Sequence, residues 1–337
     1  MASLIKLRLS MLGSIALVIG ITTLILSAIL SLFSYGADVL MILTFSLMFV
    51  VGVHFLQWLI SPWIIEALYK VRPVTSTGDL WVAEMVERVA RASGLKRVPK
   101  AMISQLGIPN AFAYGNFLSG YKVAVTQGLI DSLPREEVEA VVAHEVGHIK
   151  HRDVEVMMVI SILPALIYWL GRILIYSGFY SSGRSRESRS TPALAFLMGM
   201  ILIIVSFLSN LVVLYISRLR EYYADSNSVL TLPEGGRNLQ RALARILVAS
   251  GAISRPRSGE ISSATKLKAL LISDPELGIK SSIRTYDIDE VVEWIKSQKR
   301  ISPLEIFSTH PDPAKRLRFI DSLEQETSKT RYTILRV

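Results

Sequence analysis

The chain is basic and unusually apolar: it has 337 residues, 51% of them hydrophobic, a formal net charge of +9 and a mean hydropathy of +0.42. This apolar content excludes an ordinary soluble protein and indicates a membrane protein. The absence of cysteine excludes a disulfide framework and thiolate chemistry, and since no nucleic-acid-binding module is recognisable, we assign the basicity to contact with an anionic membrane surface.

Four apolar stretches are long enough to span a membrane. Residues 11–33 and 39–60 carry no charged side chain, and residues 156–176 and 193–216 follow later in the chain. A helix of ~20 apolar residues crosses a hydrocarbon core of ~30 Å. The first stretch is too long for the apolar region of a signal peptide and lacks a convincing cleavage site, so we expect it to remain attached. His54 lies inside the second stretch, where a structural role is about as well supported as a functional one.

A soluble segment follows the second stretch. Residues 82–93 have the periodicity of an amphipathic helix, and residues 121–126 alternate as a half-buried strand. Between them, residues 109–115 are short, weakly polar and bounded by turn residues. They are interpreted either as an edge strand that pairs with an extended peptide substrate or as an internal strand without such a role. Pro134 then begins a further helix.

That helix carries the strongest chemical signal in the sequence. His144-Glu145-Val146-Gly147-His148 places two imidazoles four residues apart, and therefore on one helix face, as a zinc site requires. Glu145 lies one residue round, where its carboxylate can act on water instead of binding the metal. This is the HExxH arrangement of zinc peptidases. Three of the five histidines lie between positions 144 and 151, which makes a metal-free amphipathic helix the weaker alternative.

A catalytic zinc site needs a third protein ligand. The metzincin pattern would require Gly at position 151 and His at position 154, but the chain has His151 and Val154. His151 itself follows His148 too closely on one short helix to complete a tetrahedral site. Better candidates are Glu221 and Asp225, which share a helix face after the fourth stretch. One would bind the metal, and the other would hydrogen-bond a ligand histidine.

The C-terminal part is predicted to be mostly helical. Apolar residues recur at helical spacing over residues 233–250, 287–298 and 312–325, whereas residues 177–191 and 254–265 have the composition of polar loops. His310 precedes the last of these helices, and Arg316 falls in its first turns. From the residues alone, a structural role for this histidine is favoured over a functional one.

The metal site fixes the predicted topology. His148 precedes the third stretch and Glu221 follows the fourth, so both must emerge on the same side of the membrane to reach one ion. The first two stretches form a hairpin around residues 34–38, which places the N-terminus on that side too. Basic residues near the ends of the stretches are more numerous on that side: Lys6, Arg8, Lys70, Arg72, Lys150, Arg152, Arg218 and Arg220, against Arg184, Arg186 and Arg189. The site is therefore expected to face the cytoplasm.

Four motifs in order resemble the HtpX group of membrane zinc endopeptidases, which are gluzincins related to the CAAX prenyl endopeptidases. In chain order they are Asn110-Ala111-Phe112-Ala113, residues 144–148, residues 217–225 after a hydrophobic pair, and Thr309-His310-Pro311. The likeness runs over nearly the whole chain. One departure is Asp312, where the family often has a second proline.

The resemblance implies a mainly α membrane protein: four transmembrane helices with a gluzincin-like zinc protease domain, made of helices and a small β-sheet, on the cytoplasmic side. The expected parts are an N-terminal hairpin (1–60), the first part of the catalytic domain (61–155), a second hairpin (156–216) and the second part of the catalytic domain (217–337). It further implies a cell-membrane protease that degrades misfolded or damaged membrane proteins.

The resemblance also implies roles for individual residues. One zinc ion per chain is expected, with Glu145 as general base and then general acid. The other assignments are metal ligands His144, His148 and Glu221, a hydrogen-bonding partner Asp225, a substrate-pairing edge formed by Asn110, Ala111, Phe112 and Ala113, and transition-state stabilisers His310 and Arg316. The expected partners are membrane-protein or unfolded polypeptide substrates and the lipid bilayer, with no nucleic acid; no oligomeric state is assigned.

Three other hypotheses fit the sequence less well. An intramembrane site-2-type protease would place the motif within an apolar span, but charged residues surround it here. A prenyl-protein processing enzyme would favour a larger helical chamber than four spans can build. A non-catalytic zinc-dependent scaffold would need no general base, so Glu145 argues against it.

Overall fold

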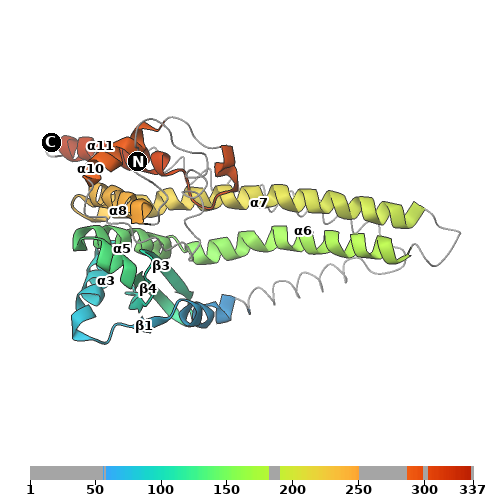
Figure 1. Ribbon diagram of the computed structural model, residues 1–337, viewed down its shortest axis with the longest axis horizontal. Helices are drawn as coiled ribbons and strands as arrows, with labels where there is room; N and C mark the ends of the chain where they lie inside the picture. The colour runs from blue at the N-terminus through green and yellow to red at the C-terminus, as the bar shows by residue number, and fades with distance from the viewer. Residues whose placement is uncertain (1–55, 57, 182–189, 250–286, 299–302, 335–337) are drawn as a thin grey trace. The chain divides into compact units, whose positions relative to one another are not determined.

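The computed structural model describes residues 56, 58–181, 190–249, 287–298 and 303–334 (Figure 1). The predicted first span, almost all of the second with His54, the turn at 34–38 and the link at 254–265 lie outside the described residues, as does most of the polar loop. The chain divides into two compact units. Leu59–Val154 and Arg218–Val337 belong to the first, and Glu155–Ser217 belongs to the second with the N-terminal residues.

A four-stranded mixed sheet lies in the first unit. Its strands are β1 (Val71–Pro73), β2 (Lys100–Ser104), β3 (Ala111–Asn116) and β4 (Gly120–Thr126), in the order β1-β2-β4-β3. β2 and β4 are parallel, whereas the β3–β4 hairpin and the β1–β2 pair are antiparallel. β3 is therefore an edge strand. The predicted strand at 121–126 matches β4, and the segment at 109–115 overlaps β3, shifted by about one residue at its end.

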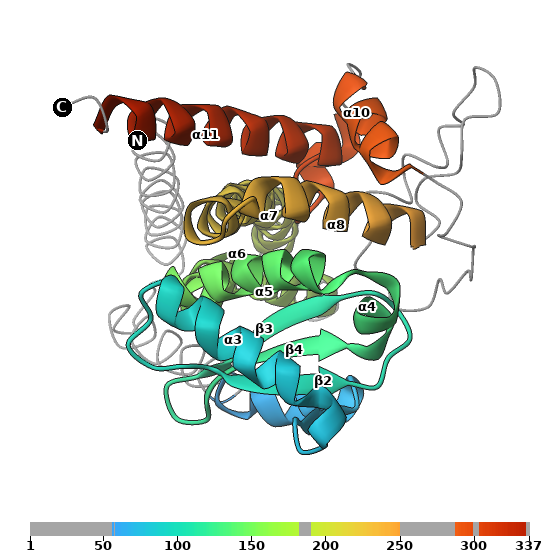
Figure 2. The ribbon, with the colours of Figure 1, turned by 90° about the vertical axis from the view of Figure 1, so that its left-hand side faces the viewer.

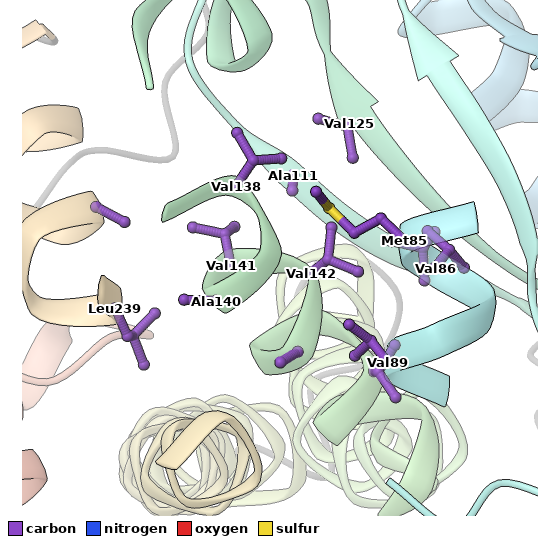
Figure 3. Close-up of a cluster of buried hydrophobic side chains, with 14 of the residues drawn as sticks. Met85, Val86, Val89, Ala111, Val125, Val138, Ala140, Val141, Val142 and Leu239 are labelled. Carbon is purple, nitrogen blue, oxygen red and sulfur yellow. The ribbon is translucent and has the colours of Figure 1, made fainter. Parts of the chain in front are cut away.

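Alternation along the strands divides the sheet into two apolar faces. Val123 and Val125 face the main core, which α3 (Leu80–Ala92) and α5 (Arg135–Lys150) cover (Figures 2 and 3). The opposite face buries Met102, Tyr114 and Ala124 against Ile65 of the helix Trp58–Leu68. Helices therefore cover both faces of this small sheet.

The remaining helices complete the first unit. α4 (Gln127–Ser132) begins where the Thr126 side chain accepts a hydrogen bond from the Leu129 N–H. α8 (Gly235–Ala249) packs on α5 and, through a second apolar cluster, on α10 (Ile288–Ser297) and α11 (Pro313–Ile334). Two short 3₁₀ helices, η1 (Thr77–Asp79) and η3 (Pro303–Phe307), precede α3 and α11. Asp312 caps α11, since its carboxylate accepts from the Ala314 N–H, which accounts for an acidic residue at this position.

The second unit contains most of α6 (Asp153–Ser181) and α7 (Ser190–Thr231), which cover the predicted third and fourth spans. Gly171 and Gly199 let these two helices approach closely, as in packed membrane helices. Within the described residues, one helix is long and apolar enough to cross a membrane, Ala193–Thr231, and Leu163–Ile175 is a shorter apolar helix. The mainly helical fold with a small sheet is confirmed, and the number of four spans stays a prediction.

In the first unit, α5 and the last part of α7 pack so closely that their backbones are in contact. Gly147 faces Ala224 and Asn227, and polar contacts hold the pair in register. The Asn227 amide donates to the Ala143 carbonyl at 2.7 Å, and the Ser228 hydroxyl donates to the Ala140 carbonyl at 3.1 Å. This contact places Glu221 and Asp225 opposite the histidines of α5.

We expect Gly147→Ala to destabilise the protein. The added β-carbon would lie 2.9 Å from both Ala224 Cα and Asn227 Cβ, and overpacking of this kind costs about 1–3 kcal/mol. The check is a lowered thermal unfolding midpoint relative to Gly78→Ala, a control whose β-carbon would meet no atom within 4 Å. Equal midpoints for the two variants would contradict the close contact.

Candidate metal centre

Helix α5 presents two imidazoles to one point. Pro134 precedes the helix, and Glu136 and Glu137 occupy its first turn, where negative charge is favourable. One turn apart near its end, His144 and His148 direct their Nε2 atoms at each other across 3.2 Å. Most of this part of α5 is buried, so the rings have little freedom to turn elsewhere.

Glu221 of α7 supplies the third potential metal ligand. Its Oε2 lies 3.7 Å from His144 Nε2, and its Oε1 lies 3.6 Å from His148 Nε2. In a tetrahedral zinc site with bonds of ~2.0–2.1 Å, neighbouring ligand atoms lie about 3.3 Å apart. The two nitrogens and the carboxylate therefore fit a zinc ion with only small adjustment.

His144 contacts a buried carboxylate, that of Asp225, which is in turn paired with a buried arginine, Arg316. Asp225 Oδ1 lies 2.9 Å from His144 Nδ1, on the side of the ring away from the metal position. Arg316 of α11 binds both oxygens of that carboxylate, with its Nε and Nη2 at 3.0 and 2.6 Å. Its Nη1 also lies 3.3 Å from Glu221 Oε2. The Arg316 guanidinium is therefore engaged by two buried carboxylates, those of Asp225 and Glu221.

His148 is held in the same way by residues that the sequence analysis missed. Its Nδ1 donates to Asp153 Oδ2 at 2.6 Å, and Arg220 Nε lies 3.0 Å from Asp153 Oδ1. Asp153 and Arg220 are both buried. Both histidines are thus oriented from behind by a carboxylate that is itself paired with an arginine.

Glu145 points toward the edge strand. Its Oε2 accepts a hydrogen bond from the Ala113 N–H at 2.9 Å. Glu145 also forms a cluster with His144 and His148 in which one potential ligand atom of each lies within 4.8 Å of the others. The Glu145 carboxylate is therefore fixed beside the metal position without taking the third ligand position, which belongs to Glu221.

His310 lies on the loop before α11, on the outer side of the metal position. Its Nδ1 lies 2.9 Å from Glu221 Oε2, and its side chain is 50% exposed. The loop is anchored by Arg218, whose Nη1 donates to the carbonyls of Glu305, Ile306 and Ser308. The exposed histidine is thus held at a fixed place beside a buried site.

Only part of the predicted segment 110–113 presents a free edge. The Asn110 N–H donates to Thr126 Oγ1 and its carbonyl accepts from the Thr126 N–H, so both backbone groups are used internally. Phe112 packs its ring against Tyr69 at 5.1 Å between centroids, on the far face of the sheet. The Ala113 N–H points away from β4, because it bonds Glu145, and alternation gives Ala111 the same outward direction.

The electrostatic environment favours a cation. Burial lowers the pKa of His148, but the hydrogen bond to Asp153 and the charges of Glu221 and Glu145 outweigh burial and raise this pKa to about 9. Burial raises the pKa of Glu221, which lies beyond the predicted span, yet His310, Arg316 and His148 hold it well below its usual value. The third potential ligand, Glu221, is therefore an ionised carboxylate at neutral pH.

Comparison with known proteins places the chain in a family. The model of peptidase family M48 matches residues 76–324. A protease HtpX homolog of Aeropyrum pernix is 40% identical over 320 residues, covering 94% of this chain and 95% of the relative. Protease HtpX homolog 2 of Saccharolobus solfataricus is 36% identical over 326 residues, covering 95% and 98%. The crystal structure of S. mikatae Ste24p shares the fold, with a TM-score of 0.51 and 20% identity over 94% of this chain and 67% of that one.

We expect Asp153→Asn to weaken metal binding without unfolding the protein. Loss of the carboxylate behind a ligand histidine typically lowers metal affinity by about 10–100-fold. A competition titration with a chromophoric chelator measures this change. Asp131→Asn is the matched control, since Asp131 pairs with Gln127 on the exposed surface of α4. If both variants bind zinc equally tightly, Asp153 does not position His148.

Proposed function

The chain belongs to peptidase family M48 and is a metalloprotease of the HtpX type, and from this premise we propose that it is a membrane zinc endopeptidase that hydrolyses misfolded or damaged membrane proteins at the cytoplasmic face. The observation that carries the proposal is the triangle formed by His144, His148 and Glu221, with Glu145 held beside it by the edge strand. The site combines a zinc-type ligand set with a separate carboxylate suited to proton transfer.

In this proposal His144, His148 and Glu221 hold one zinc ion per chain. When bound, zinc supplies a Lewis acid that polarises the scissile carbonyl and makes water acidic enough to lose a proton near neutral pH. Glu145 takes that proton and delivers it to the leaving amine as the peptide bond breaks. Before a substrate binds, the 2.9 Å contact with the Ala113 N–H keeps the Glu145 carboxylate beside the metal position.

His310 is proposed to stabilise the transition state. It is half exposed on the outer side of Glu221, where a bound substrate would lie. Its Nδ1 faces Glu221, so Nε2 is the ring nitrogen that can donate a hydrogen bond to the substrate when it carries a proton. Negative charge develops on the carbonyl oxygen during attack, and a fixed donor there accelerates the reaction. Arg316 contributes by holding Asp225 and Glu221 rather than by reaching the oxygen.

An extended polypeptide is the proposed substrate. The outer edge of β3 offers main-chain groups at Ala111 and Ala113, and main-chain pairing accepts many sequences. This suits a protease that removes damaged proteins of varied sequence. The excess of basic residues near the predicted span ends on the side of the site supports a multi-pass protein whose catalytic segments, 61–155 and 217–337, face the cytoplasm.

We expect Glu145→Gln to retain zinc and to lose peptide hydrolysis, by about 10²–10⁴-fold, because the amide cannot accept the proton. Zinc content and cleavage of a detergent-solubilised membrane-protein or casein-type substrate are measured together, with and without a chelator. Chelator-sensitive cutting by wild type alone, at equal zinc content, supports the proposal. Equal cutting by Glu145→Gln would refute it, and zinc in both with cutting in neither would favour a scaffold.

We expect His310→Ala to lower kcat by about 10²–10³-fold with little change in KM, since one transition-state donor is removed. His310→Gln should lose less, because its amide can still donate. Steady-state kinetics with zinc content measured in parallel separates this effect from loss of the metal through the contact with Glu221. An unchanged kcat in His310→Ala would exclude the assigned role.

A further inference from the structure

The turn of the β3–β4 hairpin exposes two large apolar side chains that the turn itself does not need. Phe117 and Leu118 are each 61% exposed, in a position where turns usually carry polar residues or glycine. The turn is closed by other groups. Asn116 Oδ1 accepts from the N–H groups of Leu118 and Ser119, and Gly120 adopts a φ of 75°. Something other than turn geometry therefore accounts for the phenylalanine and the leucine.

This turn is tied to the point where the chain leaves the predicted second span. The Asn116 side-chain amide donates to the Leu59 carbonyl at 3.2 Å, and the predicted span ends at residue 60. The helix Trp58–Leu68 continues from there beneath the sheet, where Glu66 accepts from the Tyr114 hydroxyl and from Lys122. The hairpin and the helix that continues the span are therefore braced together.

The same helix has an exposed apolar stripe. Ile60, Trp63, Ile64 and Leu68 recur at helical spacing and are 48%, 56%, 46% and 70% exposed. Tryptophan is enriched where a membrane protein crosses the interface between lipid and water. An apolar turn beside the end of a predicted span, with Ile60, Trp63 and Ile64 on the first turns of the helix that continues that span, matches a surface that contacts lipid.

We propose that Phe117 and Leu118 insert into the lipid–water interface and fix the substrate-pairing edge at a set height above the bilayer. This proposal rests on the proposed function of β3 as the substrate edge. Ala113, next to Glu145, lies four positions before Phe117, and four extended residues span at most about 13 Å. The protease then cuts extended substrate segments that lie within about 13 Å of the bilayer surface.

The absence of cysteine makes insertion directly measurable. Leu118→Cys and Gln105→Cys are each labelled with an environment-sensitive fluorophore in full-length protein reconstituted into phospholipid vesicles. Gln105 is exposed and follows the end of β2 that pairs with the end of β4, so it lies at the opposite end of the sheet from the turn. We expect a blue-shifted emission and quenching by lipid-borne quenchers for the label at 118 and neither for the label at 105.

The functional arm compares wild type with a Phe117→Ser, Leu118→Ser double variant on two substrates. One is a single-span protein with an unfolded cytoplasmic tail in the same vesicles, and the other is a soluble unfolded polypeptide. We expect the variant to lose cutting close to the span of the first substrate and to cut the soluble polypeptide at the wild-type rate. A single Phe117→Trp variant, which keeps a large aromatic side chain in the turn, should cut both substrates as wild type does.

Three outcomes would overturn the inference. Labels at 118 and 105 with equal exposure to water would exclude insertion, and shielding of the label at 118 without lipid-borne quenching would show that a protein covers it instead. Equal cleavage of both substrates by variant and wild type would exclude the role in site selection. If wild type cuts neither substrate, the proposed function fails, whereas the label positions still decide whether the turn enters the membrane.

Discussion

The backbone contact between α5 and the last part of α7 is the constraint on which the site depends. Because Gly147 has no side chain, Ala224 and Asn227 can lie against α5, and the Asn227 amide bonds the Ala143 carbonyl. The contact brings the two histidines of one helix to the carboxylates of another. The candidate ligand atoms are therefore placed by packing of the protein itself, which would reduce the reorganisation that binding of a metal requires.

The buried charges around the ligands form two similar chains. One runs from His144 through Asp225 to Arg316, and the other from His148 through Asp153 to Arg220. Burying a carboxylate is costly unless a partner compensates its charge, and each arginine supplies that partner. Because buried ion pairs often add little net stability, we infer that these two chains serve to fix one arrangement of the candidate ligands.

Local patterns could predict the parts of the site that lie on continuous helices. The spacing of His144 and His148, and of Glu221 and Asp225, follows from helical geometry. Asp153 could not be found in this way, because Arg152 adopts a φ of 55° between α5 and α6 and breaks the helical spacing. The same limit applies to β1 and to the parallel pairing of β2 with β4, which depend on contacts between distant segments. The family resemblance implied a transition-state role for Arg316, whereas its contact with both oxygens of Asp225 is visible only in three dimensions.

The hydrogen bond from Ala113 to Glu145 has a consequence for the resting protein. The donor that holds this carboxylate is also one of the main-chain groups that an incoming strand would use. Under the proposed function, a substrate that pairs along β3 would compete with Glu145 for the same N–H. If β3 acts as the proposed substrate edge, the protein without substrate blocks part of that edge with its own carboxylate, and a bound polypeptide would free Glu145 from the strand.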